Sequence, residues 1–130
     1  MIRKLFLPSL LLLLAAIAIT SCSGSRKFTQ VGKASYYSNK FQGKKMANGD
    51  RYRKGKLTAA HKTLPFGTKV KVTNQQNGKT VKVKITDRGP HVRGRIVDLS
   101  RAAANRIDMV EAGTVPVKLK VIRRSRSAGR

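Results

Sequence analysis

Residues 70–85 read VKVTNQQNGKTVKVKI, and this stretch predicts the fold class of the chain. Apolar residues alternate with polar ones, mostly lysines, on both sides of Asn77-Gly78, which is the period of a strand with one buried and one solvated face. Asn and Gly both tolerate the positive φ angles of a tight turn, so the two strands are expected to form a hairpin. The stretch therefore predicts antiparallel β-structure in the middle of the chain.

Further strands are expected on both sides of this hairpin. Apolar residues and lysines alternate again at residues 117–121, and residues 34–37 and 96–99 are two shorter strand candidates. Ser100 is a favoured N-cap for a short helix over residues 101–106, where three consecutive Ala residues favour helix. Several short strands with little helix predict an all-β domain, a small closed or partly closed barrel, and the periodicity leaves its topology open.

The N-terminal residues predict export and a lipid anchor. Arg3 and Lys4 precede an apolar run over residues 5–19, and small or polar residues follow, which is the order of a secretory signal peptide. The run is shorter than the roughly 20 residues of a membrane-spanning helix. Residues 19–22, ITSC, resemble a lipobox, so we expect residues 1–21 to be a signal peptide and Cys22 to carry lipid. The alternative is an ordinary signal peptide followed by a chance Cys.

The chain is strongly basic, which bears on its partners. It has 29 Lys and Arg against 5 Asp and Glu, a formal charge of +24, and removal of Arg3 and Lys4 lowers this by two, to +22. Such a charge attracts polyanions, among which nucleic acid is the usual first candidate, but export argues against it. The anions of a cell envelope are phospholipid and lipopolysaccharide head groups and the carboxylates of peptidoglycan peptides. A surface charge that only keeps the domain soluble is the alternative.

Composition also divides the chain into segments. Residues 22–30 are polar and are expected to form a tether between the lipidated Cys22 and the domain. The domain itself is expected over residues 31–122. Residues 123–130 are rich in Arg and Ser and are expected to be a disordered tail.

The acidic and histidine residues are few enough to consider one by one. The acidic residues are Asp50, Asp87, Asp98, Asp108 and Glu111. Asp87 follows a strand pattern, where it could form a turn or pair with an arginine, and Asp98 ends the next strand, where it could cap the helix. His61 follows a run of small residues, and residue types alone fit a structural role for it. No cluster has the spacing of metal ligands and no phosphate-binding loop is present, so neither a metal nor a cofactor is expected.

Seven segments, taken together and in order, resemble the rare lipoprotein A (RlpA) family. They are ASYY at residues 34–37, ANGD at 47–50, LTAAHKTLPFG at 57–67, VKVTN at 70–74, NG at 77–78, TDRGP at 86–90 and IVDLSRAAA at 96–104. The resemblance covers residues 31–122 and implies a six-stranded double-psi β-barrel, related in fold to expansins and the MltA lytic transglycosylases. It also implies endolytic cleavage of peptide-poor peptidoglycan glycan strands between N-acetylmuramic acid and N-acetylglucosamine, leaving a 1,6-anhydromuramic end.

The resemblance implies roles for particular residues as well. Asp87 would be the acid/base, which protonates the leaving oxygen and then takes the proton of the sugar's own C6 hydroxyl. Asp98 matches the acidic residue implicated in the related expansin and MltA barrels and is the rival candidate. His61 and Asp50 would complete the catalytic group in the same groove. The residues implied in substrate binding are Tyr37, Asn48 and Arg88.

Two positions depart from the family pattern and keep a second function open. Asp50 stands where members usually have Glu, and Arg53 stands where they often have Asp, so one carboxylate is shorter and another is replaced by a cation. A glycan-binding envelope lipoprotein without turnover is therefore the alternative. Family lipoproteins often carry a C-terminal SPOR domain that localises them to division sites; none is expected here, so septal recruitment is not implied.

The expected location and partners follow from the lipid anchor and the resemblance. We expect a monomer that is bound to peptidoglycan glycan strands, to anionic envelope components and, through its lipid, to a membrane. The periplasmic face of the outer membrane is favoured over the inner membrane because of Ser23, which follows the lipidated cysteine.

Overall fold

The computed structural model describes residues 27–125. The predicted signal peptide at residues 1–21, the predicted lipidation site at Cys22 and the last part of the predicted tail, residues 126–130, lie outside the described residues. Within the described part of the chain, no helix is long and apolar enough to cross a membrane.

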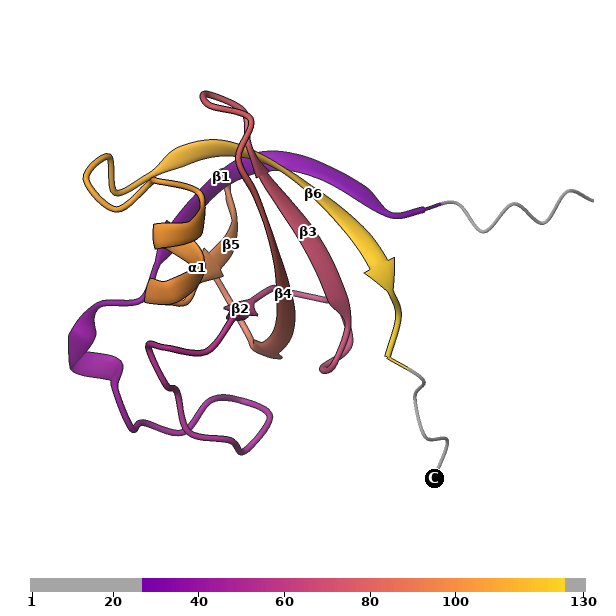
Figure 1. Ribbon diagram of the computed structural model, residues 1–130. Coiled ribbons are helices and arrows are strands. Elements are labelled where there is room, and N and C mark those ends of the chain that lie inside the picture. Colours follow the sequence, from indigo (N-terminus) through magenta and orange to yellow (C-terminus); the bar gives the residue numbers. More distant parts are fainter. Residues whose placement is uncertain (1–26, 126–130) are drawn as a thin grey trace, which may run out of the picture.

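Six strands form a closed barrel in the described residues (Figure 1). They are β1 (Thr29–Tyr36), β2 (Thr58–Ala60), β3 (Lys69–Asn74), β4 (Thr80–Asp87), β5 (Arg95–Leu99) and β6 (Val115–Arg123), with the short helices η1 (Asn39–Phe41) and α1 (Arg101–Arg106). The order around the barrel is β1-β5-β2-β4-β3-β6, in which β1 is parallel to β5 and β2 is parallel to β4. The expected fold, a mainly β, six-stranded double-psi barrel, is confirmed.

The alternating segments form β3, β4 and β6, as predicted from their period of two. Along these strands the alternating apolar residues are buried and most residues between them are more exposed, and Ile122 near the end of β6 is an exposed exception. Val70, Val83 and Leu119 are fully buried in one continuous core with the apolar residues of the other strands. Full burial of such a side chain stabilises the fold by about 1.5–3 kcal/mol, so these positions hold the barrel closed.

The β3–β4 hairpin is present, but its turn differs from the expected tight turn. Five residues, 75–79, connect the strands, and only Gly78 has a positive φ, at 75°. Asn77 contributes through its side chain instead, which accepts a hydrogen bond from Lys79 N at 2.9 Å and donates one to the Ile107 carbonyl at 3.0 Å. These two bonds stabilise a loop of five residues, and the expected hairpin between the two alternating segments is confirmed.

Two features of the barrel go beyond the predicted strands. Residues 58–60 form β2, which lies between β4 and β5, although small residues without alternation gave no strand signal. β1 begins at Thr29, before the expected domain start at residue 31, because Thr29 and Gln30 pair with β6. β6 ends at Arg123, one residue beyond the expected domain end.

Helix α1 follows β5 directly and is capped as predicted. The Ser100 hydroxyl accepts a hydrogen bond from Ala103 N at 3.2 Å, which satisfies one of the free amides of the first turn. Ala103 and Ala104 are fully buried against the barrel. Since Ser100 fills the cap position, Asp98 does not cap this helix.

Candidate active site

The two aspartates that competed for the acid/base role lie on either side of one residue. Ala60 of β2 is paired with Asp98 of β5 on one side and with Asp87 of β4 on the other. Neighbouring strands are about 4.8 Å apart, so the backbones at the two aspartates are separated by roughly 10 Å. The parallel and antiparallel pairings of the short strand β2 thus bring together two carboxylates from different parts of the chain.

Asp87 is held by three hydrogen bonds, each from a neutral donor. Its Oδ1 accepts from Ala47 N at 2.8 Å and from Arg88 N at 2.9 Å. Its Oδ2 accepts from the Tyr37 hydroxyl at 2.5 Å. A tyrosine hydroxyl can accept as well as donate, whereas a backbone amide can only donate. Oδ2 is therefore the oxygen that can carry a proton without loss of a hydrogen bond.

Tyr37 is influenced by both aspartates. Burial raises the pKa of its hydroxyl most, followed by the hydrogen bond to Asp87 and the charge of Asp87, and then by the charge of Asp98. The hydroxyl therefore stays protonated throughout the physiological range and remains available to Asp87. Its ring packs against Tyr52 at 4.6 Å and Phe41 at 5.7 Å between ring centroids.

The long connection between β1 and β2 supplies the other groups around Asp87. Its residues 46–50 pass over the end of β4, where Asn48 N donates to the Thr86 carbonyl at 3.2 Å and the Thr86 hydroxyl donates to the Met46 sulfur at 3.2 Å. Tyr52 is buried and its hydroxyl accepts from Arg101 N at 3.1 Å, which fixes the connection to α1. The sequence analysis missed Tyr52 and Ala47; for Tyr52 the available signal was a single aromatic residue in the basic segment 51–56.

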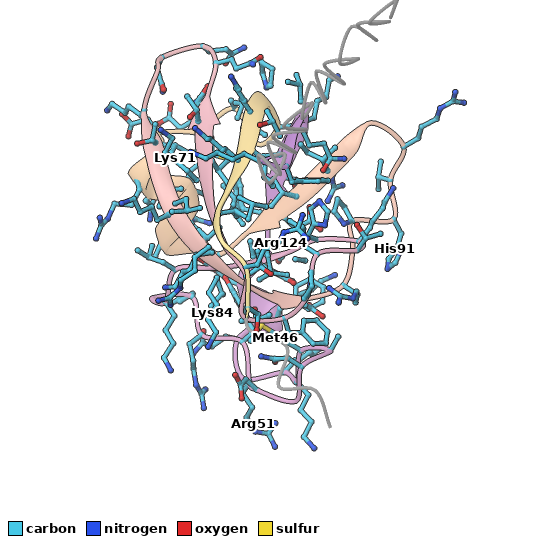
Figure 2. All side chains as sticks on the ribbon, turned by 90° about the vertical axis from the view of Figure 1, so that its right-hand side faces the viewer. Met46, Arg51, Lys71, Lys84, His91 and Arg124 are labelled. Carbon is cyan, nitrogen blue, oxygen red and sulfur yellow. The ribbon has the colours of Figure 1, made fainter. Side chains whose placement is uncertain are left out.

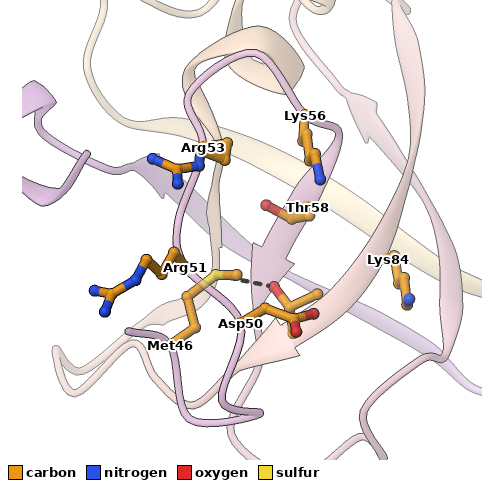
Figure 3. Close-up of a pocket in the computed structure, with 8 residues that line it drawn as sticks. Met46, Asp50, Arg51, Arg53, Lys56, Thr58 and Lys84 are labelled. Carbon is orange, nitrogen blue, oxygen red and sulfur yellow. Dashed lines mark hydrogen bonds between the residues drawn. The ribbon is translucent and has the colours of Figure 1, made fainter. Parts of the chain in front are cut away.

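Asp50 lies in a cavity that does not include Asp87. Asn48 holds it, through a bond from Asn48 Nδ2 to Asp50 Oδ2 at 3.0 Å and one from Asp50 N to Asn48 Oδ1 at 2.9 Å. The cavity, of about 390 Å³, is shown in Figure 3. Its lining residues are Met46, Asp50, Arg51, Arg53, Lys56, Thr58, Lys84 and Thr86. One carboxylate therefore stands among four cations, and Arg53, a departure from the family pattern, is one of them.

The His61 ring is fully occupied by structural hydrogen bonds. It is 3% exposed, its Nδ1 accepts from Thr63 N and Leu64 N at 3.1 Å each, and its Nε2 lies 2.8 Å from Gln30 Oε1. Since Nδ1 accepts, Nε2 carries the proton and donates it to Gln30. Burial lowers the pKa of His61, and the charges of Arg88 and Lys62 lower it further, so the neutral form is favoured.

The expected single group of Asp87, His61 and Asp50 is therefore not present as a set of facing side chains. His61 meets Asp87 through the backbone, where His61 N donates to the Asp87 carbonyl at 3.1 Å. Its ring turns to Gln30 and the following loop because two backbone amides there need an acceptor. Asp50 lies in the adjoining cavity.

The other predicted site residues are held by the protein as well. Arg88 Nη1 donates to the carbonyls of His61 at 3.2 Å and Leu64 at 2.8 Å, and its guanidinium lies over the Phe66 ring at 4.0 Å. Arg88 thus holds the loop after β2. Asp98 is paired with Arg95, with 2.7 Å between Oδ1 and Nη2. Residues 27–125 contain no group of three His, Cys, Asp or Glu side chains that could hold a metal ion.

The barrel and its acidic site define a double-psi β-barrel domain, and solved structures share this fold. The apo-expansin of Clavibacter michiganensis superposes with a TM-score of 0.59 and 25% sequence identity, over 74% of this chain and 51% of that chain. A family model described as lytic transglycolase matches residues 29–119. The chain therefore belongs to the RlpA family of lytic transglycosylases, as the sequence motifs predicted.

Individual relatives are similar over the same part of the chain. The endolytic peptidoglycan transglycosylase RlpA of Campylobacter jejuni is 54% identical over 94 residues, covering 72% of this chain and 34% of that protein. The protein of the same name from Vibrio cholerae is 54% identical over 95 residues, covering 73% of this chain and 36% of that protein. The chain thus spans about a third of the length of these two relatives.

Proposed function

We propose that this protein is a lytic transglycosylase that cleaves peptide-poor peptidoglycan glycan strands, with Asp87 as its acid/base. The observation that carries the proposal is the arrangement of the Asp87 carboxylate, in which one oxygen is anchored by two amides and the other faces a hydroxyl. The similarity to relatives named endolytic peptidoglycan transglycosylases supports the substrate class.

The reaction needs one carboxylic acid that acts twice. Protonated at Oδ2, Asp87 donates its proton to the glycosidic oxygen as the bond from that oxygen to C1 of N-acetylmuramic acid breaks. The C6 hydroxyl oxygen of the same sugar then bonds to C1, and the Asp87 carboxylate takes the proton that this hydroxyl loses. The acid is restored, no water is consumed, and the product carries a 1,6-anhydromuramic end.

Asp87 fits this role better than Asp98 because of its partners. Asp98 is paired with the Arg95 guanidinium, and protonation of Asp98 would break that ion pair. The three donors around Asp87 are neutral, and the Tyr37 hydroxyl can reverse its hydrogen bond when Asp87 is protonated. Asp98 then acts as a fixed negative charge near the reacting sugar.

The remaining predicted residues take supporting roles in this proposal. His61 and Arg88 position the loop after β2, on which Asp87 depends through its backbone. Asp50 and Asn48 contact the glycan in the adjoining cavity. The exported chain is anchored in the envelope by lipid on Cys22, with residues 31–122 as its folded domain.

Digestion of purified, peptide-free glycan strands tests the function. The full chain should release fragments that end in 1,6-anhydromuramic acid, identified by mass spectrometry. If the chain retains the strands on a column but releases no such fragments, the protein is a glycan-binding lipoprotein without turnover and the enzymatic proposal is wrong. Separately, Cys22→Ala should move the protein from the detergent phase to the aqueous phase; unchanged partitioning would exclude the lipid anchor.

A further inference from the structure

The outward faces of β4, β3 and β6 form a continuous array of lysines. We call this array the cationic wall, and it consists of Lys82 and Lys84 of β4, Lys69 and Lys71 of β3, and Lys118 and Lys120 of β6. Neither an aromatic residue nor a carboxylate occupies an outward position of these three strands, all of which lie within the described residues. Figure 2 labels Lys71 and Lys84, which lie one below the other on this side of the barrel.

Five of the six wall lysines stand directly opposite another lysine across the sheet, whereas Lys118 is paired with Thr73. Lys71 is paired with Lys82 on one side and with Lys120 on the other, and Lys69 is paired with Lys84. Directly paired residues have Cβ atoms about 4.5–5.5 Å apart, and like charges at such positions destabilise a sheet. The fold therefore carries an electrostatic cost on this face, which an anionic partner would relieve.

We propose that the cationic wall docks the protein on a membrane surface of anionic phospholipids. Its single sign of charge and its lack of aromatic residues fit phosphate head groups better than a glycan, because sugars are usually held against aromatic rings. Lysine is a compact point charge, which suits a diffuse layer of phosphates, whereas arginine suits paired recognition of one anion.

The connectivity places the predicted lipid beside this wall. Thr29, at the start of β1, is paired with Lys120 of the wall, and Cys22 lies seven residues before it. Seven extended residues span at most about 25 Å, so lipid on Cys22 would hold the wall close to the bilayer. This step rests on the proposed lipid anchor; the charge pattern of the wall does not.

Docking by the wall also leaves the β2 and β5 side of the candidate active site accessible. The wall comprises β4, β3 and β6, whereas Asp98 and Ala60 lie on β5 and β2. Asp87 is the last residue of β4, and its carboxylate is bound by Tyr37 and Ala47, which lie outside the wall strands. A protein that rests on its wall therefore presents β5 and β2 away from the membrane, where a glycan strand would reach them.

Vesicle binding with matched charge variants tests the proposal. The full chain and its variants are mixed with vesicles of phosphatidylcholine alone and with vesicles that also contain phosphatidylglycerol. A partition coefficient is measured for each kind of vesicle, and the value with phosphatidylglycerol is divided by the value without it. This ratio cancels the contribution of the lipid or the N-terminal apolar residues. Each wall lysine should contribute about five-fold to this ratio, so the triple variant Lys71→Gln, Lys82→Gln, Lys120→Gln should lower it roughly 100-fold.

The control removes the same charge from the connection between β1 and β2. The triple variant Lys40→Gln, Lys45→Gln, Lys54→Gln changes three exposed lysines outside the wall and should lower the ratio less than about five-fold. Equal losses in both triple variants would overturn the proposal, because net charge alone would then explain binding. An unchanged ratio with weaker binding of the wall variant to purified sacculi would also overturn it and assign the wall to peptidoglycan.

Two further measurements separate this proposal from folding and from activity. The wall variant should melt at or above the temperature of the unmodified chain, since it removes like-charge pairs. Release of anhydromuramic fragments from soluble strands should be the same in both triple variants, so failure of the enzymatic proposal leaves the vesicle result unaffected. If the triple variant melts early, the single variant Lys71→Gln should still lower the ratio about five-fold, and an unchanged ratio would contradict docking.

Discussion

The hydroxyl of Tyr37 donates to Oδ2 of Asp87 at 2.5 Å and joins two residues that are 50 positions apart. Tyr37 follows β1 and Asp87 ends β4, and these strands are not neighbours in the barrel. The bond therefore depends on closure of the whole barrel, and it links the fold directly to the group proposed to do the chemistry.

Loss of this hydroxyl should lower turnover without unfolding the protein. Tyr37→Phe removes a hydrogen bond to a charged group, worth about 1.5–3 kcal/mol, so release of anhydromuramic fragments should fall roughly 10- to 100-fold. Tyr36→Phe is the matched control, because the Tyr36 hydroxyl donates to the Val110 carbonyl at 2.7 Å, away from Asp87. Equal rates in the two variants would show that the bond to Asp87 does not assist catalysis.

The buried His61 predicts a loss of stability in mild acid. Its pKa is lowered by burial and then by Arg88 and Lys62, so below the ordinary value of about 6.5 the unfolded chain binds more protons than the folded one. Stability should be complete above this pH and should fall as the pH drops through the lowered pKa. Thermal unfolding measured from above the ordinary value of about 6.5 downward into mild acid tests this.

The two histidines of the chain provide the comparison for this test. His61→Gln should remove the dependence of the melting temperature on pH in this range. His91→Gln changes an exposed histidine and should leave the dependence intact. If His61→Gln still shows the full acid-induced loss, the titrating group is another residue.

Arg88 is expected to stabilise the fold through the hydrogen bonds that its planar guanidinium donates. Its guanidinium donates to the carbonyls of His61 and Leu64 and covers Phe66. Arg88→Lys keeps the charge but not the planar geometry, and it should lower the free energy of unfolding by about 1.5–3 kcal/mol in urea titrations. Arg93→Lys, at an exposed position, should change it by less than about 0.5 kcal/mol. Unchanged stability in Arg88→Lys would show that these contacts do not stabilise the fold, and Arg88 would then remain a candidate for substrate binding.

Repulsion within the cationic wall makes one stabilising substitution predictable. Lys71→Glu turns two like-charge pairs, with Lys82 and Lys120, into two opposite-charge pairs. Each should contribute about 0.2–1 kcal/mol, so the melting temperature should rise, and the gain should shrink in high salt. Lys40→Glu on η1 is the control and should have little effect. A lower melting temperature for Lys71→Glu at low salt would mean that the wall lysines do not repel one another appreciably.

The parts of the fold that could be predicted are those whose signal is local. The alternation of valine, isoleucine and lysine predicted β3, β4 and β6, and the Ser100 cap predicted α1, because each pattern is complete within a few residues. Strand β2 consists of Thr58, Ala59 and Ala60 and exists only because β4 and β5 flank it. Its small residues could not show this.

The same distinction applies to the candidate site. Asp87 could be found as a candidate because of the family motifs; its position after a strand pattern fitted only a turn or a pair with an arginine. The hydrogen bonds of the candidates could not be predicted, since Ala47 and Tyr37 reach Asp87 over 40 and 50 positions through barrel closure. Gln30 likewise reaches His61 over 31 positions. The backbone amides of Thr63 and Leu64 also donate to the ring of His61. This structural role could not be predicted from the residue types alone.

The rate of anhydromuramic product formation by Asp87→Asn, beside Asp98→Asn, tests the central claim most directly. Asparagine keeps the size of the side chain but cannot transfer the proton, so Asp87→Asn should lower the rate by about 10²- to 10⁴-fold, with the melting temperature used to verify folding. Asp98→Asn should retain measurable turnover. A folded Asp87→Asn variant that cleaves peptide-free strands at the rate of the unmodified chain would contradict the account.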